Sequence, residues 1–462
     1  MPTEPFSLKS IAVPAYGPTL LYGLATGAIL PVIALTARDL GASVPLAALI
    51  ITLTGIGSLV TNVPATVITT RFGERGALVV AAAWCAAAMV TAATVPVLGV
   101  FALSVFMVGM AGSVFGLARQ SYLTEAVPLH MRARALSTLG GVNRIGVFAG
   151  PFISAGAMHF LGTPGAYWTG AVAALGAGLL SLQVPPVAAS PAYRRQPEPS
   201  PTESSSSSPS ATSSAASASP ASSSPASSPT TPSSAAAVPA GQPGGHAAAD
   251  STETGTTTGT GTAPAGTLPP TVRRILRSHA RVFRTVGVGV LLIAAVRATR
   301  QAVIPLWAQH LGLDPTATSL IYGLSGAIDM LIFYPAGKVM DRFGRRWIAV
   351  PCMLTMGAGL ALLPLTSTPG QLLAVAMLIG FGNGIGSGIV MTLGADFSPS
   401  PGRPQFLGIW RLLADLGTMG GPALLSGVTA LAALPAGIAA TAVLGFLGAG
   451  ALWAWVPKRP GS

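Results

Sequence analysis

Five charged residues lie inside long apolar stretches of the sequence, where charge is rare: Arg144, Arg297, Arg300, Asp329 and Asp415. An ionisable side chain within hydrocarbon costs at least about 2.5 kcal/mol on insertion scales and is a functional candidate by default. Arg297 and Arg300 are three residues apart and share one face of a helix. They are expected either to bind an anionic or zwitterionic solute group, or to form a structural pair with Asp329 that touches no solute.

Two buried acids are candidates for carrying a proton, because burial favours the neutral form of a carboxylate. These are Asp329 and Asp415, and Asp415 also has Arg411 one helical turn earlier, which predicts a local structural pair. Cys85 and Cys352 lie in separate apolar runs and predict neither a disulfide nor a metal site. No nucleophile, metal cluster or nucleotide-binding motif indicates an enzyme, a cofactor or an ATP-driven pump.

The elements that position these residues are expected to be transmembrane helices. Of 462 residues, half are hydrophobic and only 8% are charged, against roughly 25% in a soluble domain. Apolar stretches of about 20 residues, each long enough to cross about 30 Å of hydrocarbon, recur along the chain. The sequence predicts an all-α integral membrane protein with twelve spans at about 13–37, 44–69, 77–97, 99–123, 136–160, 165–184, 285–309, 316–340, 347–367, 370–395, 405–430 and 433–456.

These spans divide into two groups of six, residues 1–184 and 272–462. Residues 185–271 between them are rich in Ser, Pro, Ala and Thr. Such a composition cannot bury enough apolar surface to offset its ordering entropy, so a disordered cytoplasmic linker is predicted. The basic stretch 273–284 that follows is predicted to lie as an amphipathic helix on an anionic leaflet.

The net charge of +12 is interpreted as a topology signal. The cations lie at the ends of the apolar segments and not in a stripe with aromatics, which argues against a nucleic-acid partner. Because they gather on one side, the positive-inside rule predicts cytoplasmic termini and linker. We expect a multi-pass protein of the plasma (inner) membrane that acts as a monomer on a small molecule, with protons as the coupling ion.

The two groups of spans are copies of one another. Pro64, Arg71, Phe72, Gly73 and Arg75 recur as Pro335, Arg342, Phe343, Gly344 and Arg346, at a constant offset of 335 − 64 = 271. The same offset relates Gly109 to Gly380, Gly112 to Asn383, Glu125 to Asp396, Arg132 to Arg403, Gly146 to Gly417, Gly150 to Gly421 and Pro151 to Pro422. A gapless register over this length indicates a duplicated six-helix unit, which is typical of one class of transporter.

The residues after the eighth span carry a family resemblance. Gly337, Asp341, Arg342, Phe343, Gly344, Arg345 and Arg346 are similar to the motif between helices 2 and 3 in each half of major facilitator superfamily transporters. The resemblance implies two pseudo-symmetric six-helix bundles and a cytoplasmic gate of ion networks. Its residues are Arg71, Gly73, Arg75, Glu125 and Arg132 in the first half, and Gly337, Asp341, Arg342, Gly344, Arg345, Arg346, Asp396 and Arg403 in the second. The first copy departs from the pattern at Thr66, Thr70 and Glu74. The alternative is that these charges lie at helix ends only to set the orientation of the spans in the membrane.

Gly146, Gly150 and Pro151, with Gly417, Gly421 and Pro422, form a predicted helix hinge, since small residues allow close helix approach and proline bends a helix. The first set resembles the motif of proton-coupled drug antiporters. The arginine which those antiporters have on helix 4 is replaced by Val105 here. In the family helices 5 and 8 meet, so Arg144 is expected to form a state-dependent salt bridge with Asp329.

Together these features predict a secondary active transporter that exports small organic molecules by alternating access, with proton antiport as the driving force. Uptake of an organic anion or metabolite is the alternative within the class, and there the arginines of the seventh span would select the solute. From another class, a non-transporting membrane sensor or scaffold that signals through the linker is also compatible with the sequence.

Overall fold

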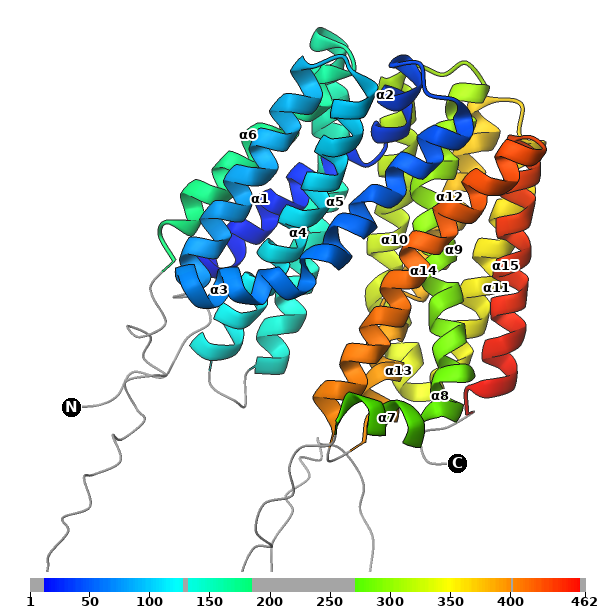
Figure 1. Ribbon diagram of the computed structural model, residues 1–462. Coiled ribbons are helices and arrows are strands. Elements are labelled where there is room, and N and C mark those ends of the chain that lie inside the picture. The colour runs from blue at the N-terminus through cyan, green and yellow to red at the C-terminus, as the bar shows by residue number, and fades with distance from the viewer. Residues whose placement is uncertain (1–11, 128–131, 185–270, 400–401, 458–462) are drawn as a thin grey trace, which may run out of the picture. The chain divides into compact units, whose positions relative to one another are not determined.

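The computed structural model describes residues 12–127, 132–184, 271–399 and 402–457, in which every regular element is helical. The linker predicted over 185–271 lies outside the described residues, apart from its last residue. The first bundle contains α1 (Ala12–Ile29), α2 (Ile33–Asp39), α3 (Val44–Thr94), α4 (Leu98–Ala126), α5 (Arg132–Leu161) and α6 (Pro164–Ser181). These helices form the six predicted spans of the first half, with α1 and α2 as the two parts of the first span and α3 containing two spans (Figure 1).

The second bundle repeats this plan after two short helices. Those are α7 (Val272–Ser278) and α8 (Ala280–Arg284). The spans are α9 (Val286–His310), α10 (Pro315–Phe343), α11 (Arg346–Leu362), α12 (Pro369–Ile385) with α13 (Ile389–Phe397), α14 (Arg403–Leu431) and α15 (Leu434–Trp455). A 3₁₀ turn (Leu363–Leu365) ends the third of them. The fold is therefore all-α, with twelve spans in two pseudo-symmetric bundles of six.

The spans predicted at 44–69 and 77–97 are two helices within α3 that meet at a kink at Gly73, whose φ of 70° is readily adopted only by glycine. Two breaks in the backbone correct other predicted segments. The first span is broken between Ile29 and Ile33, around a proline. The span predicted at 370–395 is broken between Ile385 and Ile389. Hydropathy is blind to such interruptions, because the residues that form them are apolar or small.

Nine helical stretches in the described part of the chain qualify as membrane spans by length and hydropathy alone. The described helices α5, α6 and α14 do not qualify. α5 and α14 carry charges inside, among them Arg144 and Asp415, and α6 is short and rich in small residues. Each of the three nevertheless packs among qualifying helices of its own bundle.

The predicted hinge glycines are contact points between helix backbones. In the first bundle α1 packs on α5, and in the second α9 packs on α14. A Cβ added at Gly146 would collide with the carbonyl oxygen of Leu20, and one at Gly417 would collide with that of Leu291. Since 291 − 20 = 271, the two contacts involve equivalent residues. The duplication seen in the sequence is therefore also a duplication of helix packing.

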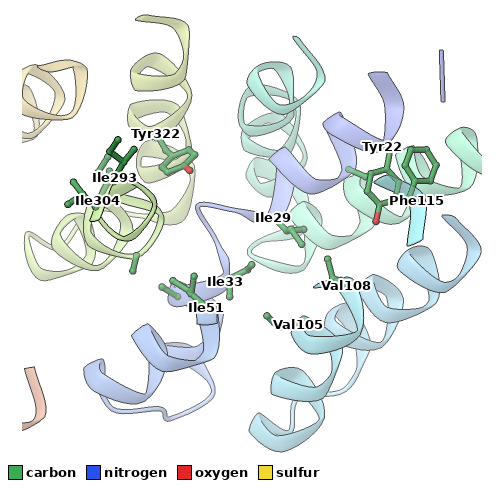
Figure 2. Close-up of a cluster of buried hydrophobic side chains, with 14 of the residues drawn as sticks. Tyr22, Ile29, Ile33, Ile51, Val105, Val108, Phe115, Ile293, Ile304 and Tyr322 are labelled. Atoms are coloured by element: carbon green, nitrogen blue, oxygen red, sulfur yellow. The ribbon is translucent and has the colours of Figure 1, made fainter. Parts of the chain in front are cut away.

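The apolar core is continuous through both bundles. In the first bundle the rings of Tyr22 and Phe115 stack with centroids 4.0 Å apart, and Figure 2 shows this pair together with Val105 and Val108. In the second bundle Ile293 and Ile304 are fully buried. The bundles meet where α3 packs on α14 and where α5 packs on α10. At these contacts α5, which carries Arg144, faces α10, which carries Asp329, and α14, which carries Asp415, faces α3.

Candidate functional site

A cavity of about 300 Å³ lies between the bundles, walled by α5 and by Leu30, which follows the end of α1, on one side and by α9 and α10 on the other. Three of the predicted deep charges, Arg144, Arg300 and Asp329, line it. The remaining walls carry further polar side chains alongside apolar ones, namely Leu30, Asn143, Val147, Phe148, Pro151, Gln301, Tyr322, Gly323, Gly326 and Met330. A mainly apolar cleft with a few convergent polar groups is typical of a small-molecule site.

The central charged pair of the cavity joins α9 to α10. Nη1 of Arg300 lies 3.8 Å from Oδ2 of Asp329, and the two side chains are only 11% and 18% exposed. The Arg300 guanidinium also lies 5.5 Å from the ring centroid of Tyr322. Nη1 of Arg300 and Oδ1 of Asp329 have no hydrogen-bond partner among the described residues. The pair is therefore long and incompletely satisfied. The guanidinium retains donors for a solute, and the carboxylate retains an oxygen that can take up a proton.

Asn383 on α12 connects this pair to the second arginine of α9. Its amide oxygen accepts from Nε of Arg297 at 2.7 Å, and its amide nitrogen donates to Oδ2 of Asp329 at 2.5 Å. Nη1 of Arg297 donates to the carbonyl of Gly386 at 3.4 Å, in the break between α12 and α13. Sequence reasoning missed Asn383 as a site residue. The signal that could have found it was its position in the repeat, where a polar amide stands opposite Gly112.

A second cavity, of about 340 Å³, opens on the other side of α9. Arg297 and Asn383 line it, and it shares Arg300 and Gln301 with the first cavity. The part of α9 that carries Arg297 and Arg300 thus separates the two cavities. The structure brings together four of the predicted coupling residues, Arg144, Arg297, Arg300 and Asp329, in one polar region. Asp415, the fifth, lies elsewhere.

A family comparison explains this architecture. A family model described as Major Facilitator Superfamily matches residues 19–283 and 286–462. The chain belongs to the major facilitator superfamily. It is a multi-pass membrane transporter and not an enzyme, as the sequence predicted, while the narrower resemblance to drug and proton antiporters is not part of what the match shows.

Solved structures share the fold of this superfamily member at low identity. A crystal structure of a D-xylose-proton symporter is 18% identical, with 98% of this chain and 99% of that chain covered and a TM-score of 0.61. The nucleoside transporter NupG is 12% identical, with 96% of each chain covered and a TM-score of 0.60. The xylose transporter XylE from E. coli, in an inward open conformation, is 16% identical, with 99% of this chain and 98% of that chain covered and a TM-score of 0.62. No curated protein matches this sequence.

In this major facilitator protein Arg144 reaches a different partner from the expected one. Its Nη2 donates to the carbonyl of Ser387 at 3.4 Å, and its guanidinium lies 4.4 Å from the ring centroid of Phe333. Both contacts cross from the first bundle to the second. The carboxylate of Asp329 is instead taken by Arg300 and Asn383. The exchange of partners between conformations stays a prediction, since Arg144 and Asp329 line the same cavity.

Asp415 forms the predicted local pair and an additional contact across the bundles. Nε of Arg411 lies 3.5 Å from its Oδ1, as the spacing of one turn predicted. The amide nitrogen of Asn62 on α3 donates to Oδ2 of Asp415 at 3.5 Å, and Ser113 donates to the amide oxygen of Asn62 at 2.7 Å. No signal in the sequence pointed to Asn62 or Ser113, because single polar residues are common in membrane helices.

One deep arginine was overlooked among the charges of the apolar stretches. Arg119 on α4 is partly buried, and its Nη1 donates to the amide oxygen of Asn143 at 2.8 Å. Asn143 in turn lines the cavity between the bundles. Its charge inside the fourth predicted span was the signal that could have found Arg119. The hydrogen bond from Arg119 therefore orients the Asn143 amide on the first-bundle wall of the cavity.

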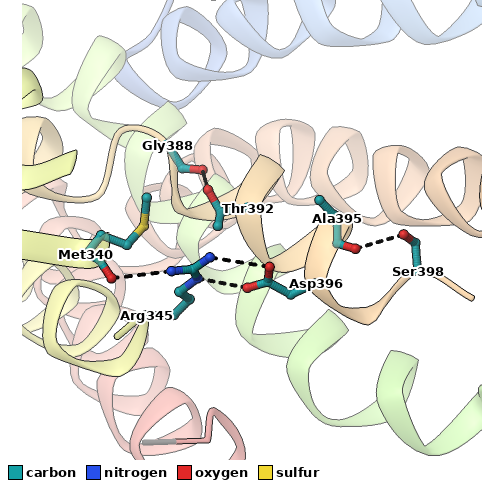
Figure 3. Close-up of polar contacts among 7 residues, drawn as sticks. All are labelled: Met340, Arg345, Gly388, Thr392, Ala395, Asp396 and Ser398. Carbon is teal, nitrogen blue, oxygen red and sulfur yellow. Dashed lines mark hydrogen bonds and ion pairs between the residues drawn. The ribbon is translucent and has the colours of Figure 1, made fainter. Parts of the chain in front are cut away.

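The structure contains one ion pair of the gate predicted by resemblance, and the gating role of these residues stays a prediction. In the second bundle Arg345 binds Asp396 through two hydrogen bonds of 2.8 and 3.4 Å, and also donates to the carbonyl of Met340 at 3.3 Å (Figure 3). This is one of the contacts expected of Asp396. Arg342 instead lies over the ring of Phe343, at 5.3 Å from its centroid. The side chain of Asp341, like that of Arg132 in the first half, lies outside the described residues.

The first-bundle gate differs from its expected form. Among the described side chains, Glu125 forms no ion pair with Arg71 or Arg75, which were expected nearby. Arg71 is exposed and lies over the ring of Phe72 at 5.9 Å. Glu74, which replaces a basic residue of the family motif, accepts a hydrogen bond from Ser121 at 3.3 Å. In the described part of the first bundle, Glu74 is thus an acid of the motif loop that contacts α4.

Proposed function

We propose that this transporter couples proton movement to the passage of a small organic solute that carries an anionic or zwitterionic group. The observation that carries the proposal is the charged lining of the cavity between the bundles. Arg144 and Arg300 contribute two positive charges and Asp329 one negative charge, and Arg297 stands behind the same wall. The excess of cations favours an anionic group, while apolar walls accept the rest of a small molecule.

Asp329 is proposed as the proton site. Its Oδ1 has no hydrogen-bond partner among the described residues and its Oδ2 faces Arg300. Protonation of Asp329 removes the negative charge that competes for Arg300, so the arginine becomes free to bind a solute carboxylate. A proton and an anionic solute then bind together. The coupling follows from electrostatics alone, since a proton bound at Asp329 and an anion bound at Arg300 restore the charge balance of the cavity.

The direction of transport depends on the charge of the solute. Export by proton exchange, which the Gly146 to Pro151 motif favours, needs a solute with a cationic group that displaces the proton from Asp329. A zwitterion meets this need and still uses Arg300. Uptake of an organic anion is the second candidate, because the excess of cationic side chains in the cavity favours joint binding of anion and proton.

The two bundles, residues 1–184 and 272–462, are each proposed to move as a unit. They rock against each other about the α3–α14 and α5–α10 contacts. The cavity is built entirely within one chain, which supports a functional monomer. The cations that gather at one end support cytoplasmic termini, and the plasma (inner) membrane is proposed as the location.

The test is a flux measurement in proteoliposomes under an imposed pH gradient, with labelled carboxylates and zwitterions as candidate solutes. We expect the gradient to drive accumulation of at least one class, and its sign to give the direction. Asp329→Asn should abolish gradient-driven accumulation and leave exchange of solute for solute. Equilibration of every solute independently of the gradient would contradict proton coupling.

A matched acid outside the cavity provides the control. Asp314 caps the start of α10, where its side chain accepts a hydrogen bond from the backbone of Thr316 at 3.2 Å. Asparagine fulfils the same capping role. Asp314→Asn should therefore retain gradient-driven transport. Equal losses in the Asp314 and Asp329 variants would assign the effect to folding and not to coupling.

A further inference from the structure

The short helices α7 and α8 carry a dense group of arginines that neither the cavity nor the gate uses. In twelve residues they place Arg273, Arg274, Arg277, Arg281 and Arg284 at the surface, without an acidic residue in either helix. Two apolar side chains of the same segment are buried instead, Ile275 and Phe283, at 4% and 6% exposure. The segment therefore has one face fixed to the protein and one strongly basic face.

The buried face is attached to the beginning of α14. The ring of Phe283 lies 4.8 Å from that of Phe406, and the ring of His279 lies 5.7 Å from it. Phe406 stacks in turn on Trp410, whose indole nitrogen donates to the carbonyl of Val390 on α13. This aromatic contact holds the segment in a defined orientation. The arginines are thus a built surface and not a freely moving tail.

The orientation of the segment suits the surface of a membrane. Figure 1 shows α7 and α8 lying across the end of the second bundle where α14 begins, at an angle to the long helices. Helices that cross the ends of spans lie along the plane of the bilayer. Val272 and Leu276 are 55% and 46% exposed and stand among the arginines. Arginine with exposed aliphatic side chains is the composition of interfacial helices.

We propose that α7 and α8 form a docking surface for anionic phospholipid headgroups. Each arginine near an anionic leaflet contributes about 1 kcal/mol, or about fivefold in affinity. The aliphatic side chains of Val272 and Leu276 enter the boundary between headgroups and acyl chains, which favours a lipid over an acidic protein as the partner. Because the segment packs on both α9 and α14, the lipid contact fixes the end of α14 and the end of α9, which borders the cavity.

The test uses the full-length protein in nanodiscs of phosphatidylcholine with or without phosphatidylglycerol. Leu276→Cys carries an environment-sensitive fluorophore, and labelling is selective because Cys85 and Cys352 are buried. We expect a blue-shifted emission that depends on phosphatidylglycerol and weakens as salt is added. Each single Arg→Gln substitution in the segment should lower the preference for phosphatidylglycerol by about fivefold. A probe that stays exposed to water with both lipids overturns the proposal.

Two matched sets of variants separate leaflet binding from other causes. Replacing all five arginines by lysine should keep the preference, because a leaflet attracts charge; loss of the preference with lysine overturns leaflet binding. The double variant Arg71→Gln with Arg75→Gln removes two exposed cations of the first bundle and should leave the signal at position 276 unchanged. An equal loss in this control also overturns the proposal. The single Arg→Gln variants suffice for the test if a multiple variant fails to fold.

Discussion

The two bundles share their backbone packing but not their polar chemistry. A Cβ at Gly150 would collide with α1 near the carbonyl of Leu24, and one at Gly421 would collide with the carbonyl of Ala295 on α9. The two partners are equivalent, since 295 − 24 = 271. Gly73 and Gly344, also equivalent, both have positive φ, at 70° and 98°. The contacts that let helices approach and turn have thus been retained in both copies.

The polar network, in contrast, belongs to the second copy. At the repeat offset of 271, its four members correspond to small or less polar residues of the first bundle. The pairs are Arg297 with Thr26, Arg300 with Ile29, Asp329 with Ser58 and Asn383 with Gly112. The comparison teaches that a duplicated scaffold can keep its helix contacts while one half becomes the charged half. We infer that the second bundle carries coupling, and that the first supplies a wall and Arg144.

One position shows the divergence at the junction of the bundles. Arg144 on α5 lies over Phe333 of α10, whereas Asp415 on α14 accepts from Asn62 of α3. Asp415 is equivalent to Arg144, and Phe333 is equivalent to Asn62, since 415 − 144 and 333 − 62 both equal 271. The same contact is therefore made twice, once by a cation on an aromatic ring and once by a carboxylate with an amide.

The largest effect is expected for Arg300, whose equivalent in the first bundle is the uncharged Ile29. Arg300→Gln should lower solute affinity about a hundredfold or more, because truncating one partner of a buried, hydrogen-bonded charge pair costs about 2 to 5 kcal/mol of binding free energy. Binding of labelled solute to the purified protein measures this loss. Arg38→Gln, which removes an arginine of α2 bonded to the carbonyl of Ala42, should leave affinity unchanged. Unaltered affinity in the Arg300 variant would contradict the assignment of binding to the second bundle.

The shared packing predicts equal losses of stability in the two halves. Gly150→Val and Gly421→Val should each destabilise the protein by about 1 to 3 kcal/mol, since both overpack a helix contact against backbone. Heating the protein with a thiol-reactive dye reports unfolding, because Cys85 and Cys352 become reactive only when exposed. Gly420→Val is the control, as a Cβ there meets nothing within 4 Å. A loss confined to one half would break the structural equivalence.

The position of Arg144 predicts a rescue experiment across the two bundles. Arg144→Asp and Asp329→Arg should each abolish transport, and the double variant should recover at least about tenfold over either single variant. That recovery corresponds to about 1.4 kcal/mol of coupling energy. Transport in proteoliposomes measures it. Absence of any recovery would show that Arg144 acts only through Ser387 and Phe333, as it does in the present conformation.

The predictions from sequence held where the information was local or repeated. The spans followed from apolar length, the Arg411 and Asp415 pair followed from a spacing of one turn, and the contact of Arg345 with Asp396 followed from a loop motif. Each of these depends on neighbours along the chain or on a single bundle. The fold class and the confirmed ion pairs were therefore accessible from the order of the residues alone.

The features that could not be predicted from the sequence depend on how the helices are placed in space. The partner of Asp329 could not be chosen from the sequence, because Arg144 and Arg300 both reach its cavity and the choice depends on conformation. Asn383 and Asn62 were missed because uncharged polar residues do not stand out in an apolar span. The break between α12 and α13 was missed because glycines leave hydropathy unchanged, although it contains the Gly386 carbonyl, which accepts from the backbone nitrogen of Ile389 and also from Arg297.

The smallest effect on stability is expected at the predicted gate, where the ion pair of the second bundle is partly exposed. Arg345 and Asp396 are 19% and 33% exposed, so Arg345→Gln should change the free energy of unfolding by only about 0 to 1 kcal/mol. Its effect on the balance between conformations should exceed that of Glu74→Gln, since the acid at position 74 holds only a hydroxyl, that of Ser121. Distances between spin labels on the loops at this end of the two bundles measure this balance. Equal shifts in the two variants would mean that both copies gate alike, and that divergence of the halves is limited to the cavity.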